Sequence, residues 1–257
     1  MKSIELFAGI GGIALAAEWA GIETVAFCER DPFCQKVLNK HWPSVPIFDD
    51  ICTLNKQFLE ERGVDIGTID LISGGYPCQP FSIAGDRKGE DDDRHLWPEV
   101  KRLLQEIRPT WFVGENVAGH VTLGLDEVLF DLENIGYTGQ PFIIPASAVN
   151  APHRRDRVFI VAHVSDSGSF GYKRIERLRK NFREIEKRGK SPFRATPKLF
   201  DDINWKKRAN ESGFLGGRNG VPNRMDRIKS LGNAVAPKQI YPVLWSIKQI
   251  HDMETQE

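Results

Sequence analysis

A glycine-rich turn close to the N-terminus places the strongest constraint on the fold of this 257-residue chain. The apolar segment 3–8 has the character of a buried strand, the turn covers residues 7–12, and a helix is predicted over 13–20. Glycines let the backbone approach a ligand closely, and the first N–H groups of the helix are free to bind it. A strand, a glycine turn and a helix in this order predict the first unit of a Rossmann-like α/β sheet.

A carboxylate follows the second predicted strand, 24–28. Glu29 lies about twenty residues beyond the turn, where its two oxygens can accept hydrogen bonds from both hydroxyls of a ribose. An adenosine-containing cofactor is therefore expected. The spacing Gly9-x-Gly11-x-x-Ala14 also fits dinucleotides, so these residues alone leave the cofactor open.

The rest of the chain continues the alternation of strands and helices. Further strands are predicted at 46–49, 68–73, 110–113, 141–144 and 158–164, and further helices at 96–108, 125–135 and 238–251. This alternation predicts one α/β core, and the chain length leaves room for a small second lobe. Asp50 and Ile51 follow the third strand, where Asp50 is also a candidate N-cap for a helix over 53–62.

A thiol stands on a stiff loop after the fourth predicted strand, within the run 74–82. Pro77 and Pro80 flank Cys78 and restrict the backbone on both sides. A thiol held in this way is a candidate nucleophile, although little of it is ionised at neutral pH without assistance. The alternative is a small buried apolar residue in a tight turn. The polar segment 85–94 that follows is expected to close over a substrate.

Three charged side chains lie near later strands. Glu115 stands beyond the apolar strand 110–113, so burial could raise its pKa and make it a proton donor; alone, it could equally be a loop carboxylate or a cap. Arg155 and Arg157 lead into the strand 158–164, and their alternation predicts that both lie on one face, aimed at the site. Surface ion pairs are the alternative for each arginine.

These motifs, in this order, resemble those of the DNA (cytosine-5)-methyltransferases of prokaryotic or phage type. The similarity covers residues 3–164 and 220–240 and includes the loop around Cys78, the Glu-Asn-Val motif at Glu115 and Gly-Asn-Ala-Val near Asn233. His153 departs from the family pattern, Gln-x-Arg-x-Arg. The resemblance implies a Rossmann-like methyltransferase sheet with a small basic second lobe. It divides the chain into a catalytic and cofactor-binding domain, 1–164, a short target-recognition lobe, 165–219, and closing motifs with a C-terminal helix, 220–257.

The resemblance also implies methyl transfer from S-adenosylmethionine to carbon 5 of a flipped-out cytosine in double-stranded DNA, without a metal. Cys78 would attack C6 of the base, a protonated Glu115 would support the ring, Arg157 would hold its O2, and Arg155 would steady the loop. The cofactor would be bound by Phe7, Ala8, Gly9, Ile10, Gly11, Gly12, Glu29, Arg30, Asp50, Ile51, Pro77, Leu96, Asn233 and Val235.

Charge and cysteine usage complete the expectations. The net charge is zero, yet residues 1–100 carry 9 Lys and Arg against 17 Asp and Glu, whereas residues 165–230 carry 18 against 8. The basic block predicts a polyanionic partner, with a solvated helical face as the alternative. Four cysteines without metal spacing predict reduced thiols in a cytoplasmic protein. No membrane span is expected, and the apolar run 6–17 is not a secretory signal, because cleavage near Ala17 would remove the glycine turn.

We expect a monomer, either an orphan or phage enzyme or one with a cognate restriction endonuclease as a functional partner. Three other functions fit part of the sequence. The same chemistry on tRNA would be distinguished by activity on each nucleic acid. A nicotinamide oxidoreductase would use the glycine turn and Glu29 but give no role to Cys78, Glu115 and Arg157. A non-catalytic DNA-binding module would not need a thiol on that loop.

Overall fold

The computed structural model describes residues 1–77, 96–151, 153–164 and 233–255, together with Glu176, Lys180 and Ser230. Outside these ranges lie Cys78, the polar segment 85–94 that is predicted to cover a substrate, almost all of the predicted target-recognition lobe and the residues 220–229.

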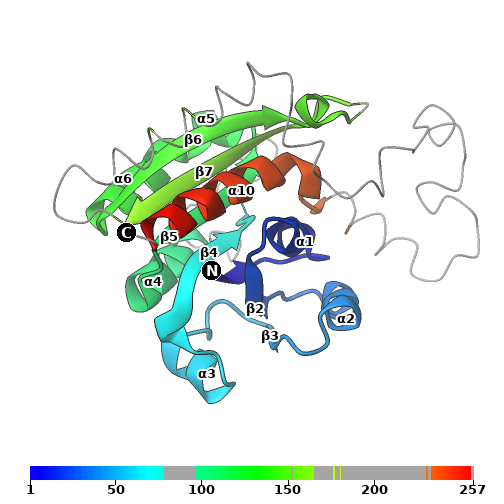
Figure 1. Cartoon of the computed structure of the whole chain (residues 1–257), viewed down its shortest axis with the longest axis vertical. Coiled ribbons are helices and arrows are strands. Elements are labelled where there is room, and N and C mark those ends of the chain that lie inside the picture. Colours follow the sequence, from blue (N-terminus) through cyan, green and yellow to red (C-terminus); the bar gives the residue numbers. More distant parts are fainter. Residues whose placement is uncertain are drawn as a thin grey trace, which may run out of the picture.

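The described chain forms a seven-stranded mixed sheet with the order β3-β2-β1-β4-β5-β7-β6 (Figure 1). The strands are β1 (Lys2–Leu6), β2 (Glu23–Cys28), β3 (Ile47–Phe48), β4 (Ile69–Gly74), β5 (Trp111–Val117), β6 (Tyr137–Pro145) and β7 (Asp156–Val164). Strands β1 to β5 are parallel, whereas β7 runs antiparallel to both of its neighbours. This is the Rossmann-like α/β sheet that the sequence predicts, so the expected fold class is confirmed for the described part.

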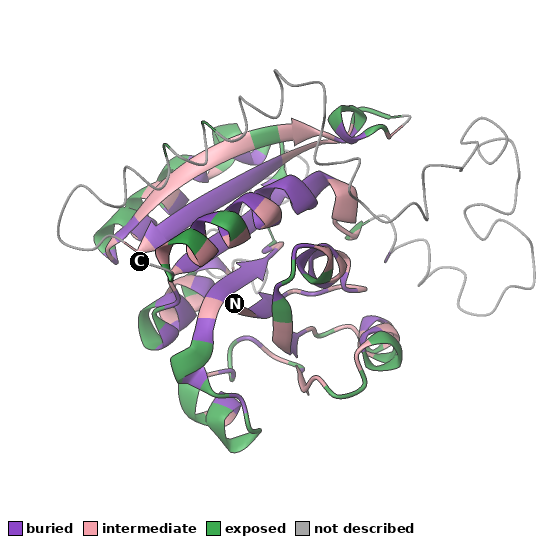
Figure 2. Cartoon of the chain, in the orientation of Figure 1, coloured by how far each residue is buried: buried purple, intermediate pink, exposed green. Residues whose placement is uncertain are grey.

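Helices cover both faces of the sheet. The α-helices are α1 (Gly12–Trp19), α2 (Pro32–His41), α3 (Lys56–Glu61), α4 (Trp97–Ile107), α5 (His120–Leu123), α6 (Leu125–Asn134) and α10 (Pro237–Glu254), and short 3-10 helices are η1 (Ile66–Thr68) and η3 (Ala146–Val149). One apolar cluster joins α4 and α6 to one face, and a second joins α1 and α10 to the other. Figure 2 shows that β4 and β7 are buried along most of their length between these layers.

The alternation of side chains across each strand assigns residues to the two layers. On β1, Ile4 and Leu6 join the cluster with α4, while Glu5 points to the opposite face, where its carboxyl meets the backbone N–H groups of Ala14 and Ile13 in α1. An acidic residue in the middle of an apolar strand therefore lies against the start of a helix.

The antiparallel strand β7 brings distant residues to the functional edge of the sheet. The register pairs Val117, at the end of β5, with Arg157, at the start of β7. The beginning of β7 therefore lies beside the carboxyl ends of the parallel strands, which is the edge where ligands bind in sheets of this kind.

Several predicted boundaries differ from the structure for identifiable reasons. Strand β5 continues to Val117 because residues Gly114 to Val117 pair with β7. Helix α3 begins at Lys56, capped by Asn55, whose side chain accepts a hydrogen bond from Phe58 N. Asp50 is therefore not an N-cap. The sequence also gave no prediction of α2, which Asp31 caps through Phe33 N and Cys34 N.

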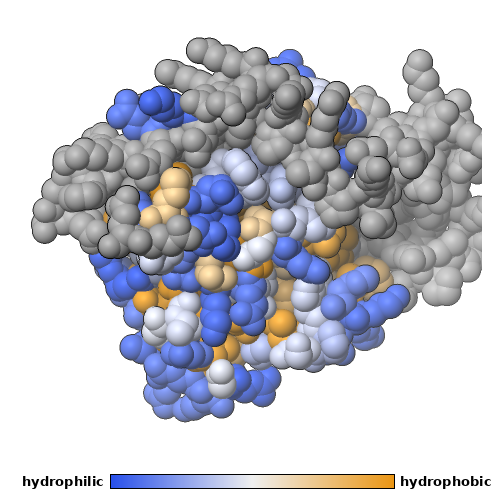
Figure 3. Space-filling model, in the orientation of Figure 1, coloured by the Kyte–Doolittle hydropathy of each residue, from blue (hydrophilic) through white to orange (hydrophobic). Residues whose placement is uncertain are grey.

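On the face shown in Figure 3, hydrophilic side chains gather at the lower edge, over α3, and hydrophobic areas are interspersed among polar ones above it. Within the described ranges, no helix combines the length and the apolar character that crossing a membrane requires.

Candidate active site

The glycine turn is held between two other segments of the chain. Phe7, Gly9 and Gly11 have positive φ values of 52°, 54° and 82°. A Cβ on Gly11 would overlap the ring of Trp42, at the end of α2, and a Cβ on Gly12 would overlap the carbonyl oxygen of Val235. The turn therefore needs glycine for close packing as well as for backbone conformation.

Glu29 ties the end of β2 to the same turn. Its Oε2 accepts a hydrogen bond from Gly9 N at 2.7 Å, and its Oε1 accepts one from Asp31 N at 2.7 Å. Each carboxylate oxygen has a second lone pair, so the group can still accept hydrogen bonds from ribose hydroxyls. A Cβ added to Gly9 would meet no atom within 4 Å, which leaves space over the turn. The turn and its carboxylate therefore fit an adenosine-containing cofactor. Arg30, next in the chain, is exposed.

The segment after β3 is fixed by an arginine that sequence analysis missed. Arg102 of α4 donates from Nη2 to the carbonyl oxygens of Ile51 and Leu54, at 3.0 and 2.7 Å. Asp50 accepts from Cys52 N at 2.9 Å, and Ile51 is buried. The helical pattern of α4 shows Arg102 only as a member of a surface ion-pair series, so it gives no sign of this contact.

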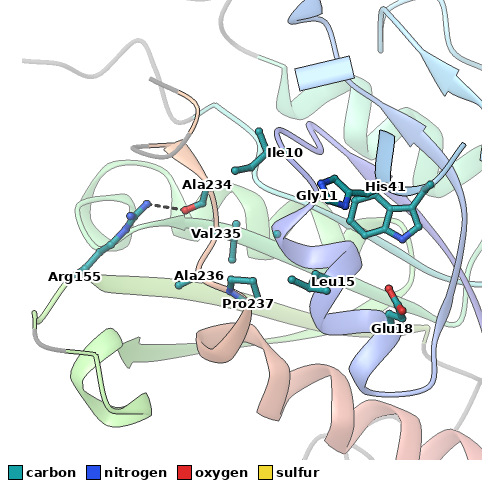
Figure 4. A pocket seen from close by; sticks show the side chains of 12 residues that line it. Ile10, Gly11, Leu15, Glu18, His41, Arg155, Ala234, Val235, Ala236 and Pro237 are labelled. Atoms are coloured by element: carbon teal, nitrogen blue, oxygen red, sulfur yellow. Dashed lines mark hydrogen bonds between the residues drawn. The ribbon is translucent and has the colours of Figure 1, made fainter. Parts of the chain in front are cut away.

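A cavity of about 610 Å³ lies beside the glycine turn (Figure 4). Four predicted cofactor residues line it, namely Ile10, Gly11, Gly12 and Val235; the other lining residues are Leu15, Glu18, His41, Trp42, Arg155, Ala234, Ala236 and Pro237. Arg155 reaches Ala234 on one side of the cavity, and His41 lies on the other.

The remaining predicted cofactor residues are distributed around this region. Phe7, Glu29 and Asp50 are not among the residues that line the cavity. Asn233 is exposed, directly before Ala234 in the cavity wall. Pro77 is exposed after the end of β4, and Leu96 is half-buried before α4. The predicted set is thus divided between the cavity, the ends of strands β1 to β4 and the start of α4.

A buried ion pair occupies the end of β5. Glu115 is 8% exposed, and its Oε1 lies 2.7 Å from Arg157 Nε. Burial raises the pKa of the Glu115 carboxyl, while the charges of Arg157 and Arg155 act in the opposite direction. A Cβ on Gly75 would come within 2.9 Å of Glu115 Oε2, so the glycine after β4 makes room for this carboxyl.

Arg155 does not lie in the strand and takes a different partner from Arg157. Strand β7 begins at Asp156, and Arg155 has a positive φ of 32°, so the expected alternation does not extend to it. Its Nη2 donates to Ala234 O at 2.8 Å. Strand alternation therefore does not determine the direction of Arg155. Arg157 contacts Glu115 directly, whereas Arg155 is hydrogen-bonded to Ala234 and its charge also acts on Glu115. That both arginines are aimed at the site stays a prediction. His153 is exposed.

The end of β4 is held by residues after β5. Asn116 Nδ2 donates to Tyr76 O at 3.1 Å, and Tyr76 Oη lies 2.9 Å from His120 Nε2. The Tyr76 ring also packs on Trp97, with 5.2 Å between ring centroids. Burial lowers the pKa of His120, which favours the neutral imidazole. These contacts fix the backbone two residues before Cys78, and the local sequence gave no sign of His120.

Comparison with known proteins identifies the family. The family model for the C-5 cytosine-specific DNA methylases matches residues 1–213 of this chain. Among relatives, the type II methyltransferase M.AquIA of Picosynechococcus sp. is 35% identical over 177 residues, which are 63% of this chain and 71% of the relative. M2.BsuMI of Bacillus subtilis is 35% identical over 171 residues, covering 63% of this chain and 42% of the relative. M.Eco47II of Escherichia coli is 36% identical over 170 residues, with 63% and 39% covered.

Solved structures agree with the fold. A prophage-encoded candidate DNA modification methyltransferase of Escherichia coli is 28% identical, with a TM-score of 0.55 over 66% of this chain and 49% of that chain. Spodoptera frugiperda DNMT2 shows the same fold at 24% identity, with a TM-score of 0.54 over 65% and 50%. The chain thus spans about half of each solved structure and about two fifths of two of the relatives. Its family match covers most of its own length, and the chain belongs to the C-5 cytosine-specific DNA methylase family.

Proposed function

We propose that the protein transfers a methyl group from S-adenosylmethionine to carbon 5 of cytosine in double-stranded DNA, through a covalent bond between the Cys78 thiol and C6 of the base. The observation that carries this proposal is the buried Glu115–Arg157 pair beside the strand end that leads to Cys78. A carboxyl and a guanidinium held together there are suited to a polar, planar base.

The chemistry requires activation of the base, because C5 of cytosine is a poor nucleophile. Attack of the Cys78 thiolate at C6, with proton donation toward N3, gives C5 the character of an enamine carbon. When bound, S-adenosylmethionine supplies an electrophilic methyl group on a sulfonium. After C5 is methylated, loss of its proton re-forms the double bond and expels the thiolate.

In this proposal Glu115 supplies the proton. Burial raises the pKa of Glu115 and so favours its neutral form at a pH where an exposed glutamate is ionised. The charges of the nearby arginines act in the opposite direction and reduce this rise. Arg157 uses Nε for Glu115 and Nη1 for the carbonyl oxygen of Asp156, so its Nη2 group could donate to O2 of the base. The base must leave the duplex to reach these groups, at a cost of roughly a few kcal/mol.

The residues of the glycine-turn edge would hold the cofactor. Glu29 would accept hydrogen bonds from the ribose, and Asp50 and Ile51 would meet the adenine, positioned by Arg102. Gly9 to Gly12, Asn233 and Val235 would hold the methionine portion. Cys78 and the predicted target-recognition lobe enter this proposal through the sequence alone.

Bisulfite sequencing of DNA from cells that express the protein tests the proposal. We expect methylated cytosines in a defined sequence context with the wild type and none with Cys78→Ala. Cys52→Ser is the matched control, because Cys52 is an exposed thiol that is not proposed to react and serine can keep its hydrogen bond with Asp50. This variant should retain methylation. Unmodified DNA with the wild type, together with methylated cytosine in tRNA from the same cells, would contradict the choice of substrate.

A further inference from the structure

Gln239 is a fully buried polar residue in the first turn of α10, and its side chain reaches across to the segments that flank β7. Its exposed fraction is 0%. The Nε2 group donates to the carbonyl oxygens of Arg155, at 3.0 Å, and Ile144. One carboxamide therefore fixes both the end of β6 and the entrance to β7.

The side chain of Arg155 in turn binds the segment that leads to Gln239. Arg155 Nη2 donates to Ala234 O at 2.8 Å, five residues before Gln239 in the closing segment. The next residue, Val235, places its carbonyl oxygen against Gly12 of the glycine turn. Two reciprocal hydrogen-bonded contacts thus join the closing segment, residues 234–239, to Arg155. We call this arrangement the Gln239–Arg155 clamp.

The clamp includes features that lower stability rather than raise it. Arg155 has a positive φ of 32°, which is unfavourable for a residue with a Cβ. The Gln239 Oε1 atom is buried without a hydrogen-bond partner in the described part of the chain. The carboxamide thus leaves one buried acceptor unsatisfied while its Nε2 group satisfies two main-chain carbonyl oxygens.

We propose that Gln239 is a positioning residue that holds Arg155, and that through the clamp the closing segment at the glycine turn sets the position of the arginine charge that faces Glu115. This inference rests on the proposed function. It assigns Gln239 a role through Arg155, without contact to either substrate.

The electrostatics of Glu115 make the role measurable. In the described chain, the charged groups that act on Glu115 are Arg157 and Arg155, and both lower its pKa. The neighbouring residues Asn116 on β5 and Tyr76 after β4 are uncharged near neutral pH. If the clamp is released, Arg155 can move away from Glu115, and the pKa of that carboxyl rises. Because the proposed role of Glu115 is as a protonated donor, the alkaline limb of the kcat profile should move to higher pH.

The experiment compares Gln239→Met, Arg155→Lys and the double variant by steady-state DNA methylation across pH. Met conserves the length of the side chain but cannot donate. We expect kcat of Gln239→Met at neutral pH to fall roughly 10- to 100-fold through misplacement of reacting groups, with the alkaline limb shifted upward. Arg155→Lys removes the guanidinium that donates to Ala234 O but leaves the main-chain carbonyl that Gln239 binds. Because Gln239 is proposed to act through the Arg155 side chain, the double variant should resemble Arg155→Lys. Gln239→Asn, a milder change, should lie between Met and wild type.

Ile250→Val is the matched control, because Ile250 is buried in the same helix away from the clamp. It should lower the melting temperature without moving the pH profile. The inference is overturned if Gln239→Met and Gln239→Asn leave the alkaline limb in place, or if the effects of Gln239→Met and Arg155→Lys are additive. With either result, methylation by the wild type would leave the proposed function intact. A folded wild type without methylation activity would contradict the proposed function itself.

Discussion

The two halves of the candidate site are held by different kinds of contact. At the glycine-turn edge, the contacts are mainly with backbone groups: Glu29 accepts from Gly9 N and Asp31 N, and Gly12 packs on a carbonyl oxygen. At the end of β5, a buried side-chain pair, Glu115 and Arg157, dominates. Backbone contacts determine shape and tolerate few additions of volume, whereas the side-chain pair determines charge and proton position. Substitutions in the two halves should therefore fail in different ways.

The largest expected effect is on the side-chain half. Glu115→Gln keeps the shape of the group but cannot donate the proton that ring activation needs, so kcat should fall roughly 10²- to 10⁴-fold. Binding of a target duplex, measured by fluorescence anisotropy at fixed salt, should change little. Glu133→Gln, at an exposed position of α6, is the control and should keep full activity. A loss of DNA affinity equal to the loss of kcat would assign Glu115 to binding instead.

The next prediction concerns Glu5, a buried acidic residue of β1 that lies against the helix after the glycine turn. Burial raises the pKa of Glu5 from 4.5 to about 8, although the N–H groups of Ala14 and Ile13 act in the opposite direction. The folded state then binds the proton more tightly than the unfolded state, so stability is greatest below pH 4.5 as far as this group is concerned. It declines as pH rises toward about 8, by up to about 1.4 kcal/mol per pH unit.

Glu5→Gln removes this titration and should flatten the decline. Urea unfolding between pH 5 and 8 measures it, as a smaller loss of unfolding free energy than in the wild type. Glu23→Gln, at an exposed position of β2, should keep the wild-type dependence. Equal pH dependence in Glu5→Gln and wild type would show that Glu5 is not the responsible group.

A smaller loss of cofactor affinity is expected when only a methyl group is added at the glycine turn. Gly12→Ala places a Cβ against the carbonyl oxygen of Val235, which must move away. Overpacking of this kind costs roughly 1–3 kcal/mol, so S-adenosylmethionine affinity should fall roughly 5- to 150-fold in calorimetry, with Glu115 chemistry intact at saturating cofactor. Gly119→Ala adds a Cβ that meets no atom within 4 Å and should bind the cofactor as the wild type does. Unchanged affinity in Gly12→Ala would show that the closing segment yields freely.

The same contrast explains what the sequence could predict. The strand, turn and helix at the N-terminus and the carboxylate at Glu29 follow from local patterns, and the sheet confirms the expected fold class. Arg102, His120 and Gln239 did not emerge, because their contacts join residues far apart in the chain: Arg102 meets Ile51, and Gln239 meets Ile144. Local periodicity carries no information on such pairs.

Arg155 illustrates the same limit. Alternation in a strand predicts that every second side chain shares a face, but the rule applies only within the strand, and β7 begins one residue later. The hydrogen bond from Arg155 to Ala234 joins residues 79 positions apart in the chain, which a local pattern does not reveal. The roles of Cys78, Glu115 and the two arginines remain predictions.

The smallest expected effect tests the hydrogen bond between Tyr76, which follows β4, and His120, which follows β5. Tyr76→Phe and His120→Gln each disturb the 2.9 Å hydrogen bond that holds the end of β4, and each should lower unfolding free energy by about 1 kcal/mol. Because the pair is one interaction, the double variant should lose less than the sum of the single losses, as a double-mutant cycle in urea measures. If the bond also positions the following Pro77 and Cys78, kcat should decline in all three variants while KM for S-adenosylmethionine stays constant. Additive losses of stability would mean that Tyr76 and His120 act through separate neighbours, and that the loop is held by Asn116 instead.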